Sequence, residues 1–295
     1  MLILHPEDLG VTANGRNYLK LIVPSDGGMI GITTFDGSEP PLQGHFPGRP
    51  VVPATALTEL VGQYGLVRLA IADPGSGVSG CFFQISSFST KVRSFVEPGK
   101  LVTIEGNVDG LQVGANLVVE RQLAVQSKVS LSLLLAEPEL EARTKRGRWQ
   151  TLLSGEMIPG ILPHRDKMLL SGLVANNARG QARALFYPRA GYYGYSNRTI
   201  VPNTILAEAM GQGSLAMLLN ERWPGRKAET YAIEITFESY CPVVFGEEVV
   251  TSFTIGRVST RTEGKSYMIR GSADAFVGGR KVAKLTSLVS VILPD

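Results

Sequence analysis

Apolar side chains recur at helical spacing in two stretches of the chain. Residues 54–71 and 203–221 carry apolar residues three or four positions apart, which is typical of a helix packed against a core. Pro53 precedes the first stretch at a position that suits the start of a helix. Pro224 and Gly225 follow the second stretch and are expected to end it. The pattern therefore predicts one long helix in each half of the chain.

The segments that follow each predicted helix alternate between apolar and polar residues or are rich in β-branched residues, and turn residues separate them. The predicted strands are 81–88, 101–108, 115–124, 129–135, 231–237, 249–258, 266–276 and 282–292. A helix that is apolar along much of its length has to be covered, and a curved antiparallel sheet is the simplest cover. We therefore expect an α+β fold.

An internal repeat relates the two halves. The segment VVPATALTELVGQYG (51–65) matches IVPNTILAEAMGQGS (200–214), so that Glu59 corresponds to Glu208, 149 residues later. A repeat of about half the chain indicates a duplicated domain rather than a solenoid. A mixed charge run after Pro138 interrupts the apolar pattern between the two copies. We predict domains at 1–140 and 152–295, joined by a linker at 141–151.

Composition narrows the classes of function. A length of 295 residues fits roughly two domains, and a net charge of +3 gives no argument for nucleic acid or an anionic membrane. Two cysteines and three histidines argue against a disulfide framework and a His-rich metal site, so no cofactor is expected. There is no basic, apolar leader and no apolar run of about 20 residues. We expect a cytoplasmic protein without membrane insertion.

The segment GHFPGRPVVP (44–53), with Glu59 fourteen residues after His45, resembles the signature of the 3-hydroxyacyl-ACP dehydratases, the FabA/FabZ group. In the second half, LPHR (162–165) and EAMGQ (208–212) are similar to that family's opening strand motif and its E-A-M-A-Q helix motif. The resemblance implies two tandem hot-dog domains, each with a long central helix wrapped by a curved antiparallel sheet. These domains would pack as a pseudo-dimer that shares one extended sheet.

The resemblance also implies a composite site, because in single-domain members the histidine and the acid come from different subunits. His45 should therefore face Glu208, with His45 as the base and Glu208 as the acid or as the group that holds the departing water. The start of a helix offers free N–H groups to a carbonyl oxygen that gains negative charge. The expected substrate-binding residues are Phe46, Gly48, Pro53, Ala54, Asn203 and Gln212.

The mirror-related site is expected to be degenerate. It would join Glu59 to position 194, and Gly194 stands there in place of the histidine, between Tyr193 and Tyr195. These tyrosines could fill a dead pocket or carry out different chemistry, because a tyrosine can donate a proton or orient a carbonyl.

The leading functional hypothesis is a dehydratase for a 3-hydroxyacyl thioester, carried by acyl carrier protein or coenzyme A, in fatty-acid or polyketide-type biosynthesis. Two alternatives stay open. One is another hot-dog thioester enzyme, such as a thioesterase, an isomerase or an acyl-transferring enzyme, and the other is a non-catalytic acyl-binding scaffold. Because the duplication supplies an internal pseudo-dimer, either a monomer or a homodimer is compatible with the sequence.

Overall fold

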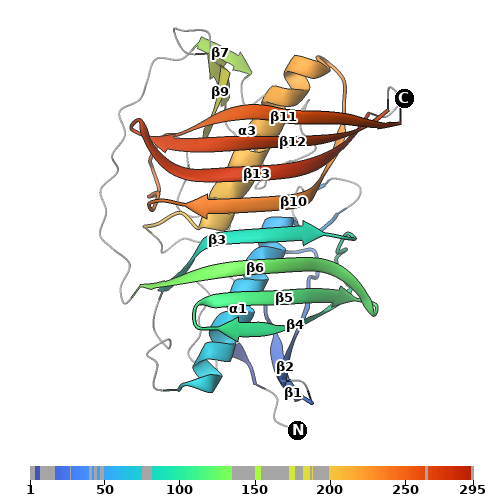
Figure 1. Ribbon diagram of the computed structural model, residues 1–295, viewed down its shortest axis with the longest axis vertical. Coiled ribbons are helices and arrows are strands. Elements are labelled where there is room, and N and C mark those ends of the chain that lie inside the picture. The colour runs from blue at the N-terminus through green and yellow to red at the C-terminus, as the bar shows by residue number, and fades with distance from the viewer. Residues whose placement is uncertain are drawn as a thin grey trace.

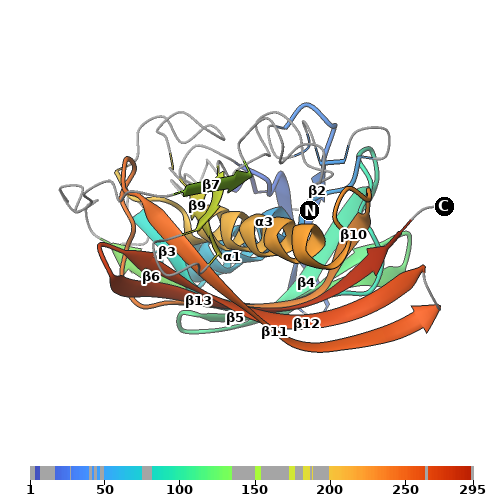
Figure 2. The ribbon, with the colours of Figure 1, turned by 90° about the horizontal axis from the view of Figure 1, so that it is seen from above.

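One curved antiparallel sheet wraps two long helices. The computed structural model describes residues 4–6, 17–26, 28–39, 42, 45–46, 50–74, 82–134, 150–153, 173–176, 182–186, 188, 199–262 and 265–293. In this part of the chain, 13 strands form a single sheet, and both helices lie against its concave side (Figures 1 and 2).

The first half contributes six strands around helix α1 (Ala54–Ala72). In chain order they are β1 (Leu21–Ser25), β2 (Gly28–Thr34), β3 (Phe82–Val92), β4 (Leu101–Asp109), β5 (Gln112–Val119) and β6 (Gln122–Leu134). Their order in the sheet is β1-β2-β4-β5-β6-β3, so β3 stands at the inner edge of this half.

The second half repeats this arrangement around helix α3 (Asn203–Arg222). Its strands are β7 (Gln150–Leu153), β8 (Leu173–Asn176), β9 (Ala182–Phe186), β10 (Glu229–Ser239), β11 (Val249–Thr262), β12 (Ser266–Val277) and β13 (Arg280–Ile292). The order β10-β13-β12-β11-β9-β8 mirrors the first half, and β7 is added at the outer edge. This duplication confirms the predicted double hot-dog architecture.

The two halves join where β3 pairs antiparallel with β10. Phe88 and Phe237, which lie 149 residues apart, face each other in this register, and their rings stack with centroids 5.4 Å apart. A pseudo-twofold axis therefore passes between these two phenylalanines. This axis relates each residue of one half to its equivalent in the other half. A site at the junction therefore combines residues of both halves.

Both helices begin directly after a proline. Pro53 and Pro202 have nearly the same extended backbone (φ −57°, ψ 141° and φ −56°, ψ 133°), and each is the N-cap of its helix. Every residue of α1 from Thr55 to Val67 is buried, so this helix is enclosed rather than amphipathic. Fully burying one leucine such as Leu57 stabilises the fold by about 1.5–3 kcal/mol. No helix of the described residues is long and apolar enough to cross a membrane.

The predicted helices and most of the predicted strands match these bounds, but the pattern predicts no ranges for β1, β2, β7, β8 and β9. The two helices were expected at 54–71 and 203–221, and each ends within one residue of that prediction. The single strand predicted over 115–124 is wrong, because a tight turn at Glu120 and Arg121 divides it between β5 and β6. Both turn residues have positive φ, 51° and 67°, as this kind of hairpin turn requires. The predicted linker lies outside the described residues up to position 149, and Gln150 already begins β7.

Candidate active site

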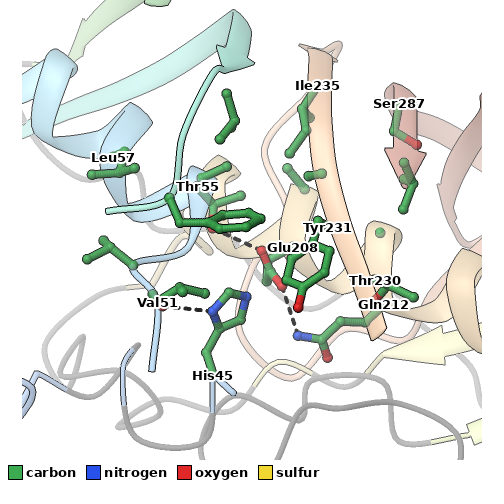
Figure 3. Close-up of a pocket in the computed structure, with 18 of the residues that line it drawn as sticks. His45, Val51, Thr55, Leu57, Glu208, Gln212, Thr230, Tyr231, Ile235 and Ser287 are labelled. Carbon is green, nitrogen blue, oxygen red and sulfur yellow. Dashed lines mark hydrogen bonds between the residues drawn. The ribbon is translucent and has the colours of Figure 1, made fainter. Parts of the chain in front are cut away.

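A cavity of about 120 Å³ opens at the start of α1, between the two halves of the molecule. The first half lines it with residues before and at the start of α1 and with residues at and just after the end of β3, and the second half lines it with residues of α3, β10 and β13. Most of the lining is apolar, including Leu57, Ile235 and Leu285. His45 and Glu208 both line it, and in Figure 3 the imidazole and the carboxylate face the same space. A mostly apolar cavity with a few convergent polar groups is suited to an acyl substrate.

The His45 side chain is held by the backbone that leads into α1. It is 9% exposed, and its Nδ1 lies 2.9 Å from the carbonyl oxygen of Val51. A carbonyl oxygen can only accept, so Nδ1 carries the proton and donates it to Val51. In the neutral ring, Nε2 is then the nitrogen that carries the lone electron pair. The stacked ring of Phe46, with its centroid 4.1 Å away, further fixes the imidazole.

The Glu208 carboxylate is partly buried in α3 and accepts a hydrogen bond on each oxygen. The Thr55 hydroxyl donates to Oε2 at 3.0 Å, and the Gln212 side-chain amide donates to Oε1 at 3.1 Å (Figure 3). Thr55 belongs to the half that carries His45, whereas Gln212 lies one turn beyond Glu208 on the same helix. Both donors stabilise the ionised carboxylate, because hydrogen bonds to a charged group favour its charged form.

The first turn of α1 supplies backbone donors beside these two side chains. Leu57 is the first residue whose N–H bonds back to Pro53, at 3.1 Å, so the preceding N–H groups have no partner within the helix. Ala54, at the very start of the helix, lines the cavity and is partly exposed. Thr58 anchors this turn: its hydroxyl donates to the Ala54 carbonyl at 2.8 Å and lies 2.7 Å from the Thr90 hydroxyl on β3.

The predicted site residues divide between two cavities that the pseudo-twofold axis relates. Phe46, Ala54 and Gln212 line the same cavity as His45 and Glu208. Pro53 is buried as the N-cap of α1 and does not itself line the cavity. Gly48 lies outside the described residues.

Asn203 lies elsewhere, because it opens α3 and not α1. It lines a second, much smaller cavity of about 20 Å³ together with Glu59, Phe83 and Thr204. Its side-chain amide donates to the carbonyl of Ile85 at 2.8 Å. Asn203 therefore occupies the mirror-related site, where Ala54 has its counterpart, and does not contact the cavity that holds His45.

The mirror-related site keeps the carboxylate and its cross-helix donor. Thr204 donates to Glu59 Oε2 at 3.0 Å, the same distance as between Thr55 and Glu208. Glu59 is only 5% exposed, whereas Glu208 opens to its cavity. Tyr193, Gly194 and Tyr195, which were predicted to replace the histidine there, lie outside the described residues.

Several cavity residues were not found from the sequence. Tyr231 on β10 packs against Phe95 of the first half, with ring centroids 4.6 Å apart, and together they form an aromatic wall. Thr55 falls within the repeated segment, and its match with Thr204 is the signal in the sequence that could have pointed to it. No group of three or more histidine, cysteine or acidic residues that could hold a metal ion lies in the part of the chain that the structure describes.

Individual relatives, rather than a family model, show the family of this chain. No family model matches it. The 3-hydroxyacyl-(acyl-carrier-protein) dehydratase FabZ of Acetivibrio thermocellus is 28% identical over 110 residues, which are 36% of this chain and 74% of that protein. The enzyme of the same name from Rickettsia africae is 30% identical over 105 residues, 34% of this chain and 72% of that protein. The chain belongs to the FabZ family. The FabZ likeness spans about a third of the chain.

Solved structures share the double fold over nearly the whole chain. A variant of the PpsC dehydratase domain from Mycobacterium tuberculosis has a TM-score of 0.58 at 13% identity and covers 94% of this chain and 98% of its own. The dehydratase domain from the CurJ module of Curacin polyketide synthase has a TM-score of 0.56 at 12% identity, covering 94% and 97%. A protein from Novosphingobium aromaticivorans, provisionally assigned as a thioesterase, has a TM-score of 0.52 at 14% identity, covering 93% and 98%. At these identities the likeness establishes the fold shared with this FabZ-family chain.

Proposed function

We propose that the chain removes water from a 3-hydroxyacyl thioester to give the 2-enoyl thioester, in fatty-acid or polyketide-type biosynthesis. The observation that carries the proposal is that His45 from one half and Glu208 from the other line one apolar cavity at the start of α1. The FabZ relatives, which are 3-hydroxyacyl-(acyl-carrier-protein) dehydratases, supply the reaction class. The substrate would be a thioester of acyl carrier protein or coenzyme A, and the expected cytoplasmic location stays a prediction.

In this reaction His45 is the base. Nε2 of the neutral imidazole takes the proton from the carbon next to the thioester carbonyl, and Nδ1 keeps its hydrogen bond to Val51 throughout. The electron pair of the broken C–H bond moves towards the carbonyl, whose oxygen gains negative charge. The N–H groups of the first turn of α1, beginning at Ala54, have no partner within the helix and are the donors available to that oxygen.

Glu208 acts on the 3-hydroxyl group. Its two donors favour the ionised form, so the carboxylate accepts a hydrogen bond from the hydroxyl and orients it for departure. The imidazolium of His45 returns its proton to the leaving oxygen as the C–O bond breaks. Water and the 2-enoyl thioester are the products, and His45 is neutral again, so protons balance over the cycle.

A second candidate is thioester hydrolysis, which is favoured by the fold shared with the Novosphingobium protein. The same His45 would then activate a water that attacks the carbonyl, and the products would be a free acid and a thiol. The two reactions differ in what leaves the substrate, so product analysis separates them.

The deciding experiment incubates the purified protein with a 3-hydroxybutyryl thioester, either on acyl carrier protein or as an N-acetylcysteamine mimic. Mass spectrometry should show loss of one water, and the product should have the absorbance of a conjugated enoyl thioester. Release of free 3-hydroxybutyrate would instead identify a thioesterase. Binding of the thioester without any turnover would favour a scaffold role and overturn the proposal.

A further inference from the structure

Thr55 reaches across the junction between the two halves to touch the carboxylate of the other. It stands in the first turn of α1, in the half that carries His45, and its hydroxyl donates to Glu208 Oε2 at 3.0 Å. The side chain is 6% exposed, so bulk water competes little for this bond. Figure 3 shows Thr55 between α1 and Glu208, with the contact drawn as a dashed line.

This contact differs from what a threonine in a helix usually makes. Such a hydroxyl commonly bonds to a backbone carbonyl one turn earlier in its own helix. Thr58 does so, donating to the Ala54 carbonyl at 2.8 Å. Thr55 stands in the first turn, where its own helix has no carbonyl one turn earlier, and it donates instead to a side chain 153 residues away in the sequence. Branching at Cβ limits the threonine side chain to few rotamers. In the rotamer that the structure shows, the hydroxyl points at Glu208.

We propose that Thr55 is a positioning residue for the reaction, holding Glu208 in its ionised form and in its productive orientation. The proposal rests on the dehydratase function proposed above. Gln212 fixes one carboxylate oxygen from within α3, and Thr55 fixes the other from α1. The Thr55 contact therefore ties Glu208 to the same helix turn that offers donors to the thioester carbonyl. A small displacement of a catalytic group lowers the reaction rate, because the reaction proceeds only within a narrow range of distances and angles.

The chain contains its own control for this proposal. Thr204 donates to Glu59 at 3.0 Å, in an equivalent contact across the pseudo-twofold axis. Thr204 is also buried, at 4% exposed, and it lines the small cavity and not the one that holds His45. Replacing Thr204 therefore removes the same kind of hydrogen bond at a site without His45.

The test compares Thr55→Val, Thr55→Ser and Thr204→Val in the full chain, using the thioester assay and thermal unfolding. Thr55→Val removes the donor and should lower kcat roughly 10- to 100-fold with little change in KM, as for a lost hydrogen bond to a charged group. Thr55→Ser should keep kcat within about threefold, and Thr204→Val within about twofold.

Equal kcat values for Thr55→Val and Thr204→Val would overturn the positioning role, as would a Thr55→Val variant whose loss of activity lies in KM rather than in kcat. If Thr55→Val does not fold, Thr55→Cys takes its place, because a thiol is a weak donor. Activity of Thr55→Cys equal to that of Thr55→Ser would then refute the proposal. Failure of the unmodified chain to release water would refute the proposed function instead, which keeps the two tests separate.

Discussion

The two helix starts are built from the same parts but enclose different amounts of space. At the start of α1, Glu208 and Thr55 border a cavity of about 120 Å³, and at the start of α3, Glu59 and Thr204 border one of about 20 Å³. The hydrogen bond between threonine and glutamate has the same length in both places. Conservation of the polar pair therefore does not distinguish the two sites, and the surrounding side chains do.

Among the described residues, two replacements reduce the space at the closed site. Phe83 stands 149 residues before Ala232, and its larger ring lies at 4% exposure where Ala232 leaves the other cavity open. Asn203 stands where the other helix has Ala54, and its amide is tied to the Ile85 carbonyl. Duplication made this possible, because each half can change independently once both are in one chain. Under the proposed function, the open site keeps room for substrate, whereas the equivalent side chains at the other site are packed together.

The largest expected effect on turnover comes from His45. His45→Ala removes the proposed base, and kcat should fall about 10²- to 10⁴-fold, the usual contribution of general acid–base catalysis. Steady-state kinetics with the hydroxybutyryl thioester measures the change. His5→Ala, at an exposed histidine that does not line the cavity, is the matched control and should leave kcat unaltered. A His45→Ala enzyme with full activity would remove the histidine from the mechanism.

The next largest effect should distinguish the two glutamates. Glu208→Gln keeps the shape but loses the charge, and kcat should fall about 10²-fold, as for loss of an acid–base group. Glu59→Gln makes the same change in the closed site, and kcat should stay within about twofold. The pair is measured side by side under the same assay. The opposite ranking would show that His45 works with the glutamate of its own half, and the assignment across the junction would be wrong.

A smaller effect is expected from filling the open cavity. Ala232→Phe introduces at the open site the ring that Phe83 places at the closed one, and kcat/KM should fall about tenfold, mainly through KM, because the acyl group loses space. Competition between short and long acyl thioesters should show the longer one excluded more strongly. Unchanged kinetics for both would mean that Ala232 does not border the acyl group.

The reverse replacement should change turnover least. Phe83→Ala leaves a void in the closed site, so the free energy of unfolding should drop by about 3–5 kcal/mol while kcat stays within about twofold. Urea unfolding and the thioester assay give the two values on one sample. A large loss of kcat in a variant that remains folded would indicate that the closed site takes part in the reaction.

Much of the fold could be predicted from the sequence because its signals are local or repeated. Apolar spacing and the flanking prolines predicted α1 and α3, and the 149-residue repeat predicted the duplication. The turn at Glu120–Arg121 was missed because neither residue is a glycine, asparagine or proline, the usual markers of positive φ or a tight turn.

The candidate site was harder to predict, since its composition depends on contacts across the junction. His45 and Glu208 were brought together by the family resemblance and the repeat, not by any local pattern. Asn203 was predicted among the substrate-binding residues because it follows the same motif as Ala54, but the pseudo-twofold axis sends the two residues to different cavities. The role of Phe83 could not be inferred, because it depends on strand register and on a bulge in β3 between Ile85 and Ser87.

The pairing of β3 with β10 joins both contributors to the proposed site within one polypeptide. In an assembly of separate subunits, a composite site disappears when dilution drives the subunits apart. Here the local concentration of one half around the other is set by the chain itself and does not change with the amount of protein in solution. Specific activity should therefore stay constant as the enzyme is diluted. A site formed by two separate subunits would instead lose activity at concentrations where the subunits dissociate.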